Sequence, residues 1–150
     1  MNKVILVVIS LLAVVQVAFA KDLPVKKQDV SPQQLESQNK QIVILAAKQM
    51  SENLPQVINK YTTITSIKAD DTSLIYTYEI NTGSKSDKTV QAEDRTKWEK
   101  VFTKNVCERS KRFLDAQVLL SYVYISAKTK VKLFQFDVSQ AKCFKRFGLQ

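Results

Sequence analysis

The chain has 150 residues, with 23 Lys and Arg against 14 Asp and Glu, two cysteines and no histidine. This length accommodates one domain with a tail but not two substantial domains. Without histidine the protein lacks Ser-His-Asp and Cys-His relays and imidazole-bound zinc, and its two glycines and three prolines exclude Gly-rich phosphate loops and collagen-like repeats.

Residues 1–20 have the pattern of a secretory signal peptide. Lys3 supplies a positive charge, residues 4–17 are mostly apolar, and Ala18-Phe19-Ala20 places small residues at the −3 and −1 positions of a cleavage site. A membrane anchor is the alternative, but about 20 apolar residues are needed to span a bilayer and this run is shorter. We therefore expect export to the periplasm or the exterior, cleavage after Ala20, and a mature chain without a transmembrane segment.

The mature chain is expected to begin with a flexible leader, because residues 21–30 (KDLPVKKQDV) are polar and show no periodicity. Ser31-Pro32-Gln33-Gln34 then predicts the start of a helix, with Ser31 as N-cap and Gln34 completing a capping box. The helix should end or kink at Leu54, which precedes a proline. One face at helical spacing is expected to be buried: Leu35, Ile42, Leu45, Ala46, Gln49 and Met50.

Alternation of apolar residues predicts two strands over residues 64–69 and 74–80, after a short turn through Val57 and Ile58. A polar loop over residues 81–88 leads to a second predicted helix over residues 92–106. Acidic residues in its first turn, Glu93 and Asp94, suit the helix dipole. Its inner stripe is expected to comprise Trp98, Val101, Phe102 and Asn105 or Val106.

Two further strands are predicted over residues 118–125 and 131–138, after a short helical turn at residues 110–115. Together these elements indicate a single α+β domain over residues 31–150. We expect an antiparallel sheet of about four strands with the helices packed on one face, in the order α-β-β-α-β-β.

The two cysteines lie at the ends of predicted elements, Cys107 after the second helix and Cys143 after the last strand. In an oxidising compartment a structural disulfide is their simplest use. A reactive thiol pair is the alternative: basic neighbours could lower a thiol pKa, but the C-x-x-C spacing and a histidine are missing. We predict a disulfide that ties the last strand to the end of the second helix.

Several motifs resemble a family of small exported bacterial proteins of unknown function. They are Asn53-Leu54-Pro55-x-Val57, Leu74-x-Tyr76-x-Tyr78, Asn105-x-Cys107, Tyr122-x-Tyr124 and a terminal Cys143. The resemblance covers residues 51–144 and departs from the family in the last hairpin turn, residues 126–130, which lacks the expected glycine. It implies the same fold and the disulfide, and it supplies no function.

Two other kinds of side chain are candidate sites. The acidic pairs Asp70-Asp71 and Glu93-Asp94 could serve acid–base or divalent-metal chemistry, but acids are common in turns and helix starts, so no cofactor or metal is expected. The aromatic residues of the strands could form stacking platforms for bases or sugars, but cross-strand packing is favoured. These residues are Tyr76, Tyr78, Tyr122, Tyr124, Phe134 and Phe136.

Basic residues flank both cysteines, and a disulfide would bring them together with Phe144 and Phe147 as a basic face. Such a face suits an anionic partner, namely an envelope lipid head group or an acidic protein, with nucleic acid the least favoured. The alternative is a solvated charge surplus that only aids solubility. The predicted partner-binding residues are Lys104, Arg109, Lys111, Arg112, Lys142, Lys145 and Arg146.

The function that these observations favour is that of a non-enzymatic exported binding or accessory protein, for example in an envelope or secretion assembly, acting through the basic face. An inhibitor or immunity-type protein directed against an exported enzyme is a second hypothesis. A small hydrolase is the weakest, because no nucleophile–base pair can be named. A deep pocket with convergent carboxylates would favour the hydrolase, and a flat basic face would favour the other two.

Overall fold

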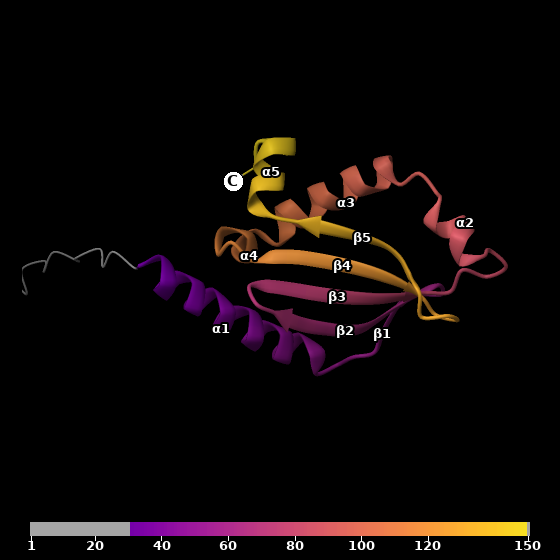
Figure 1. Ribbon diagram of the computed structural model, residues 1–150, viewed down its shortest axis with the longest axis horizontal. Helices are drawn as coiled ribbons and strands as arrows, with labels where there is room; N and C mark the ends of the chain where they lie inside the picture. The colour runs from indigo at the N-terminus through magenta and orange to yellow at the C-terminus, as the bar shows by residue number, and fades with distance from the viewer. Residues whose placement is uncertain (1–30, 150) are drawn as a thin grey trace, which may run out of the picture.

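The computed structural model describes residues 31–149, and the predicted signal peptide and leader lie outside this range (Figure 1). Five strands and five helices follow one another within it. In chain order they are α1 (Pro32–Ser51), β1 (Gln56–Asn59), β2 (Thr62–Asp70), β3 (Ser73–Ile80), α2 (Asp87–Gln91), α3 (Thr96–Arg109), α4 (Lys111–Asp115), β4 (Leu119–Ser126), β5 (Lys132–Val138) and α5 (Gln140–Phe147).

The strands form one sheet in the order β1-β2-β3-β4-β5. The fold class α+β is confirmed, but the expected all-antiparallel sheet of about four strands is wrong. β3 and β4 are parallel, and the other neighbouring pairs are antiparallel. The connection from β3 to β4 contains three helices, which is long enough to return the chain to the same end of the sheet. The fifth strand, β1, replaces the turn expected at Val57 and Ile58.

Helix α1 begins as the sequence predicts but buries a different face. The Ser31 hydroxyl accepts a hydrogen bond from the Gln34 amide, and the Gln34 side chain completes the capping box. Of the predicted face, Ala46 and Met50 pack partly buried against the core, but Ile42 and Leu45 are 42% and 66% exposed, and the fully buried residues are Asn39, Val43 and Ala47. The small Ala47 and the short Val43 allow the helix to approach the sheet closely.

The predicted second helix corresponds to α3, which begins and ends a few residues later than expected, and a separate short helix, α2, precedes it. Ser86 caps α2 by accepting a hydrogen bond from the Thr89 amide, so the helical region starts inside the expected polar loop. Glu93 and Asp94 lie between α2 and α3, not in a first helical turn, and Asp94 accepts a hydrogen bond from the Thr96 amide. Val101, expected in the inner stripe, is exposed.

The last helix, α5, was not predicted. It begins at the Ser139 cap and ends at Gly148, which has the positive φ of 64° that favours glycine. Cys143 therefore lies on a helix rather than simply after the last strand. The predicted disulfide is confirmed: it joins Cys107 on α3 to Cys143 on α5, with 5.7 Å between their Cα atoms.

Helices α1 and α3 contact the same face of the sheet near its opposite edges, α1 against β2 and β3 and α3 against β5 (Figure 1). The Met50 sulfur of α1 accepts a hydrogen bond from the Tyr76 hydroxyl, while Trp98 of α3 contacts the rings of Tyr124 and Phe136. The register places Tyr76 beside Tyr122 and Tyr122 beside Phe136, so these rings share one face. This face carries most of the buried core.

Candidate functional site

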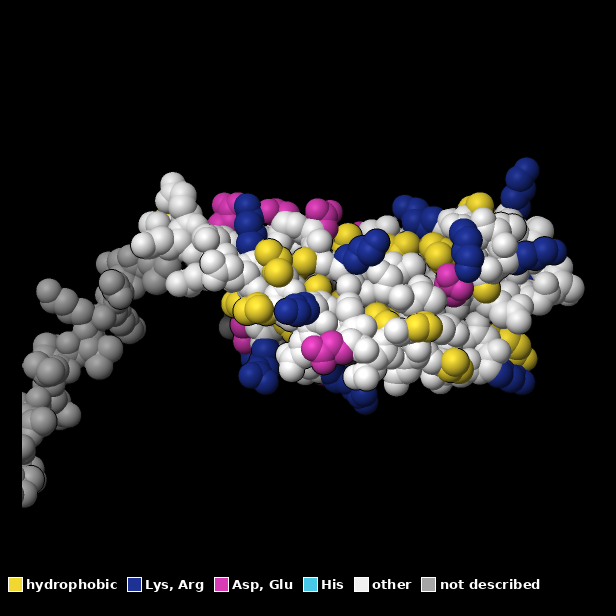
Figure 2. Space-filling view, turned by 90° about the horizontal axis from the view of Figure 1, so that it is seen from below, with side chains coloured by type: hydrophobic (Ala, Val, Ile, Leu, Met, Phe, Trp, Pro, Cys, Tyr) yellow, Lys and Arg dark blue, Asp and Glu magenta, His cyan; other side chains and the backbone are white. Residues whose placement is uncertain are grey.

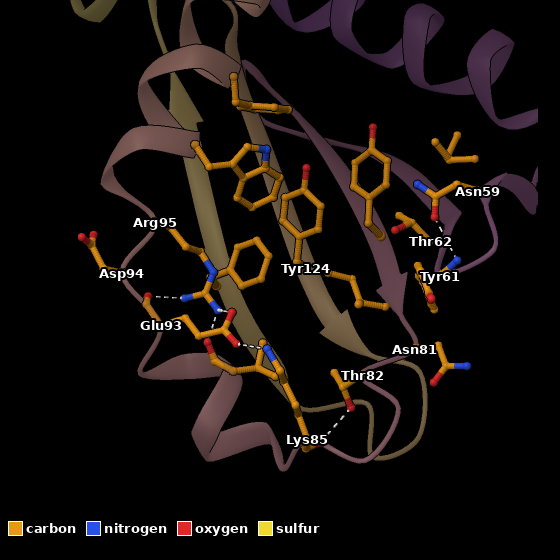
Figure 3. A pocket seen from close by; sticks show the side chains of 17 residues that line it. Asn59, Tyr61, Thr62, Asn81, Thr82, Lys85, Glu93, Asp94, Arg95 and Tyr124 are labelled. Atoms are coloured by element: carbon orange, nitrogen blue, oxygen red, sulfur yellow. Dashed lines mark hydrogen bonds and ion pairs between the residues drawn. The ribbon is translucent and has the colours of Figure 1, made fainter.

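A cleft of about 820 Å³ opens on the helix-covered face of the sheet, between the β1–β2 connection and the α2–α3 segment (Figure 3). It exists because α1 is too short to cover this part of the sheet. The last residue of α1, Ser51, donates a hydrogen bond to the carbonyl of Ile67, which pairs with Tyr76 of β3. The helix therefore ends level with Tyr76, and β3 continues beyond it to Ile80. We call it the aromatic cleft after the rings that line it: Tyr61, Tyr78, Trp98, Phe102, Tyr124 and Phe134.

The floor of the aromatic cleft is a packed layer of rings. Tyr78 stacks on Tyr124 with 5.0 Å between ring centroids, and Trp98 contacts Tyr124 edge-on at 5.5 Å. Tyr122 and Tyr124 are only 7% and 6% exposed, which fits cross-strand packing better than an open stacking platform. Burial raises the pKa of Tyr78, which lines the cleft, so its phenol remains a neutral hydrogen-bond donor well above neutral pH.

One wall of the aromatic cleft is held by Arg95. Its guanidinium lies 4.1 Å from the centroid of the Phe134 ring and donates hydrogen bonds to the carbonyls of Val90 and Glu93. The Glu93 carboxylate accepts a hydrogen bond from the Lys85 ammonium at 2.7 Å, which lowers the pKa of Glu93 (Figure 3). These contacts hold the segment between α2 and α3 against β5 and pair the charge of Glu93 with Lys85 and Arg95.

The acidic pairs have structural partners. Asp71, in the turn between β2 and β3 with φ 51°, forms an ion pair with Lys40 at 2.9 Å. The pKa of Asp94 is lowered by hydrogen bonds from Thr96. Among residues 31–149, no group of three or more Cys, Asp or Glu side chains is placed to hold a metal ion. The chemistry that the aromatic cleft offers is the binding of apolar and aromatic groups.

The disulfide brings the helices that carry the predicted basic face together, but four of its seven cations form ion pairs. Lys142 and Arg146 on α5 both contact Glu99 on α3, at 2.9 and 3.5 Å. The Lys142 hydrogen bond holds the pKa of Glu99 below its ordinary value. Lys104 pairs with Glu108 and Lys111 with Asp115, one helical turn away in each case.

The remaining three cations of the basic face are Arg109, Arg112 and Lys145. All three are exposed and have no ion-pair partner within the part of the chain that the structure describes. The sequence does not indicate Glu99 as a partner of this face, because Glu99 lies 43 positions from Lys142. The basic face therefore retains a smaller excess of charge than the sequence suggests.

The sequence did not identify the aromatic cleft as a site. Ile58 was assigned to a turn and Trp98 to a buried stripe, whereas both line the cleft. The sequence contains one indication of the cleft. The alternation of apolar residues continues to Ile80, which is farther along the strand than a helix that ends before Pro55 could cover.

A family model described as a domain of unknown function, DUF8479, matches residues 37–134, consistent with the family resemblance noted in the sequence. No curated protein matches the sequence. Within residues 31–149, no helix combines the length and apolar character needed to cross a membrane.

Solved structures with the same fold include a Pseudomonas aeruginosa protein assigned as secreted, with a TM-score of 0.64 and 14% identity, covering 73% of this chain and 96% of that one. A pilotin of the Vibrio vulnificus type 2 secretion system, EpsS, gives a TM-score of 0.60 and 17% identity, covering 74% and 96%. The type II secretion system pilotin AspS of Vibrio cholerae gives 0.57 and 12%, covering 74% and 97%. At these identities the similarity establishes a shared fold.

Proposed function

We propose a function for this chain, which belongs to the family of the domain of unknown function DUF8479. In this proposal the protein is exported, is not an enzyme, and acts as an accessory protein that binds a segment of a partner protein in the aromatic cleft.

The observation that carries the proposal is the open aromatic cleft. Its volume of about 820 Å³ lies within the range of binding pockets, and aromatic side chains are enriched where proteins bind one another. The carboxylates on its rim, Glu93 and Asp94, are engaged by Lys85 and Thr96. This argues against the hydrolase hypothesis, which requires convergent carboxylates that are available to a substrate.

The accessory role is supported by the fold. Two of the structures that share it are pilotins of type II secretion systems, and the third is assigned as secreted. We extend from them only the general role, that of an exported component that serves a larger assembly.

Site-specific photocrosslinking from the aromatic cleft tests this function. A photoreactive phenylalanine analogue replaces Tyr61, which lines the cleft and is 55% exposed, and the matched control carries it at Val131, which is 47% exposed and outside the cleft. After irradiation of cells that export each variant, we expect the Tyr61 variant alone to yield a crosslink to a defined envelope protein. Equal crosslinking from both positions, or none from Tyr61, would overturn the proposal.

The basic face is a second candidate site, for an anionic envelope component. It is favoured by the exposed Phe144 next to Lys145 and by Arg109 and Arg112, which have no ion-pair partner among residues 31–149. Reversing the charges of Arg109, Arg112 and Lys145 to Glu leaves the ion pairs of Glu99 intact, so the variant should fold. We expect it to lose binding to vesicles that contain anionic phospholipid, and wild-type binding to weaken with added salt. Wild-type binding that ignores salt would mean that the face only aids solubility.

A further inference from the structure

The two edges of the sheet differ in how far other elements cover them. Along β5, the Gln91 side chain of α2 donates a hydrogen bond to the carbonyl of Lys132, and both α2 and α3 pack against the strand. At the other edge, all four residues of β1 are exposed, and its one strand neighbour is β2. An edge strand presents backbone N–H and C=O groups that a further strand can pair with.

The exposed edge borders the aromatic cleft. Ile58 and Asn59 of β1 line the cleft, whereas Val57, which is 71% exposed, does not. Side chains of a strand alternate between the two faces of its sheet, and neighbouring strands lie about 4.8 Å apart. A strand added beside β1 would therefore direct every second side chain to the face of the sheet that bears the cleft.

The edge also carries positive charge. Residues 48–68 contain three lysines and one glutamate, and Figure 2 shows Lys and Arg side chains interspersed with hydrophobic ones on this side of the molecule. The Lys60 ammonium lies 4.7 Å from the centroid of the Tyr61 ring, and Lys68 is exposed farther along β2, beyond the residues 62–64 that pair with β1. Neither lysine has an ion-pair partner among residues 31–149, so an acidic group on an incoming segment would find cations available.

We propose that the partner contributes an extended, acidic segment that pairs with the free edge of β1 and inserts alternate apolar side chains into the aromatic cleft. Such addition of a strand combines main-chain hydrogen bonds, which give affinity, with pockets for alternate side chains, which give specificity. β1 has only four residues and a bulge at Ile58, so the paired stretch is short. This inference rests on the proposed function, and it specifies the backbone conformation and charge of the bound segment.

Selection from a displayed library of short random peptides tests the inference on the mature protein. We expect selected peptides to alternate apolar residues with a period of two and to contain Asp or Glu. The best binder is then synthesised with N-methyl groups on the amides of one edge, which removes donors but keeps every side chain. Binding should weaken about tenfold or more when the edge facing β1 is methylated and remain unchanged when the other edge is.

Charge and position are tested with matched variants. Lys60→Glu combined with Lys68→Glu should weaken peptide binding severalfold, whereas Val131→Glu, at the other end of the sheet order, should not. The inference is overturned if no peptide is selected, if the selected peptides show helical spacing, or if neither edge, methylated separately, weakens binding. It is likewise overturned if sedimentation shows a dimer that the peptide dissociates, because β1 then pairs with a second copy.

These outcomes separate the inference from the proposed function. A crosslink from Tyr61 to an envelope protein, together with insensitivity to N-methylation, keeps the aromatic cleft as the binding site and removes strand addition. Absence of the crosslink removes the proposed function itself.

Discussion

Removing the disulfide should have a large and measurable effect on stability, because it is the covalent link between the last helix and α3. The bridge joins residues 36 apart in the sequence and ties α5 to α3. For a loop of this size, the entropy of the unfolded chain predicts a contribution of about 4 kcal/mol. Small domains are stable by about 5–15 kcal/mol, so this is a substantial share.

The structure adds a local reason for the same expectation. Helix α5 has eight residues, and isolated helices of such length are marginal in water. Apart from the bridge, it is held by partly exposed ion pairs of Lys142 and Arg146 with Glu99, which contribute modestly, and by Phe147, which packs partly buried against the core. Without the bridge we therefore expect α5 to detach more readily than the sheet unfolds.

The assay is urea unfolding of the mature protein, compared with a Cys107→Ala, Cys143→Ala double variant and with the reduced wild type. We expect the free energy of unfolding to fall by about 2–5 kcal/mol in both. Hydrogen exchange should show the amides of residues 140–147 losing protection first. An unchanged unfolding midpoint in the double variant would refute this reasoning, because both the chain-entropy argument and the weak hold on α5 require a shift.

Three further outcomes are expected. N-terminal sequencing of the native protein should begin at Lys21, and retention of residues 1–20 would contradict cleavage after Ala20. Val43→Ala, at a fully buried position, should destabilise the protein by about 2 kcal/mol, whereas Leu45→Ala should change stability by no more than about 0.5 kcal/mol; equal effects in thermal unfolding would contradict the observed face of α1. Because the pKa of Glu99 is lowered from its ordinary value of about 4.3, its ion pairs stabilise the fold above that pH and are lost as the pH falls through the folded-state pKa. Glu99→Gln should therefore cost up to about 1 kcal/mol at neutral pH and less near pH 3 in urea unfolding, and an equal cost at both would count against the ion pairs.

The sequence predicted the features that depend on residues close together in the chain or on the cellular compartment. The capping box at Ser31, the alternation along β3, β4 and β5, and the pairing of Cys107 with Cys143 all follow from spacing or compartment. The buried face of α1 did not follow, because residues 42–47 are almost continuously apolar. Periodicity cannot then distinguish two faces that lie about 100° apart on the helix, and contact with the sheet decides between them.

The features that the sequence did not predict depend on distant contacts. β1 is too short for alternation to be recognised, and it is defined only by pairing with β2. The parallel direction of β4 follows from a connection through residues 81–118, whose length permits either direction. The aromatic cleft arises where α1 ends before it reaches the Ile80 end of β3, and the ion pairs of Glu99 with α5 cross 43 and 47 positions of sequence. A single sequence does not show which residues far apart in the chain come into contact in the fold.

The molecule consists of two halves, which meet where β3 pairs in parallel with β4. The first half, α1 to β3, and the second, α2 to α5, meet in the sheet along the eight residues of each strand and through the stacked rings of Tyr76 with Tyr122 and Tyr78 with Tyr124. The disulfide lies wholly within the second half. If the chain is cut in the exposed loop between β3 and α2, the disulfide therefore remains intact within the second fragment. Whether the two fragments then reassemble depends on how strongly the pairing of β3 with β4 holds them together.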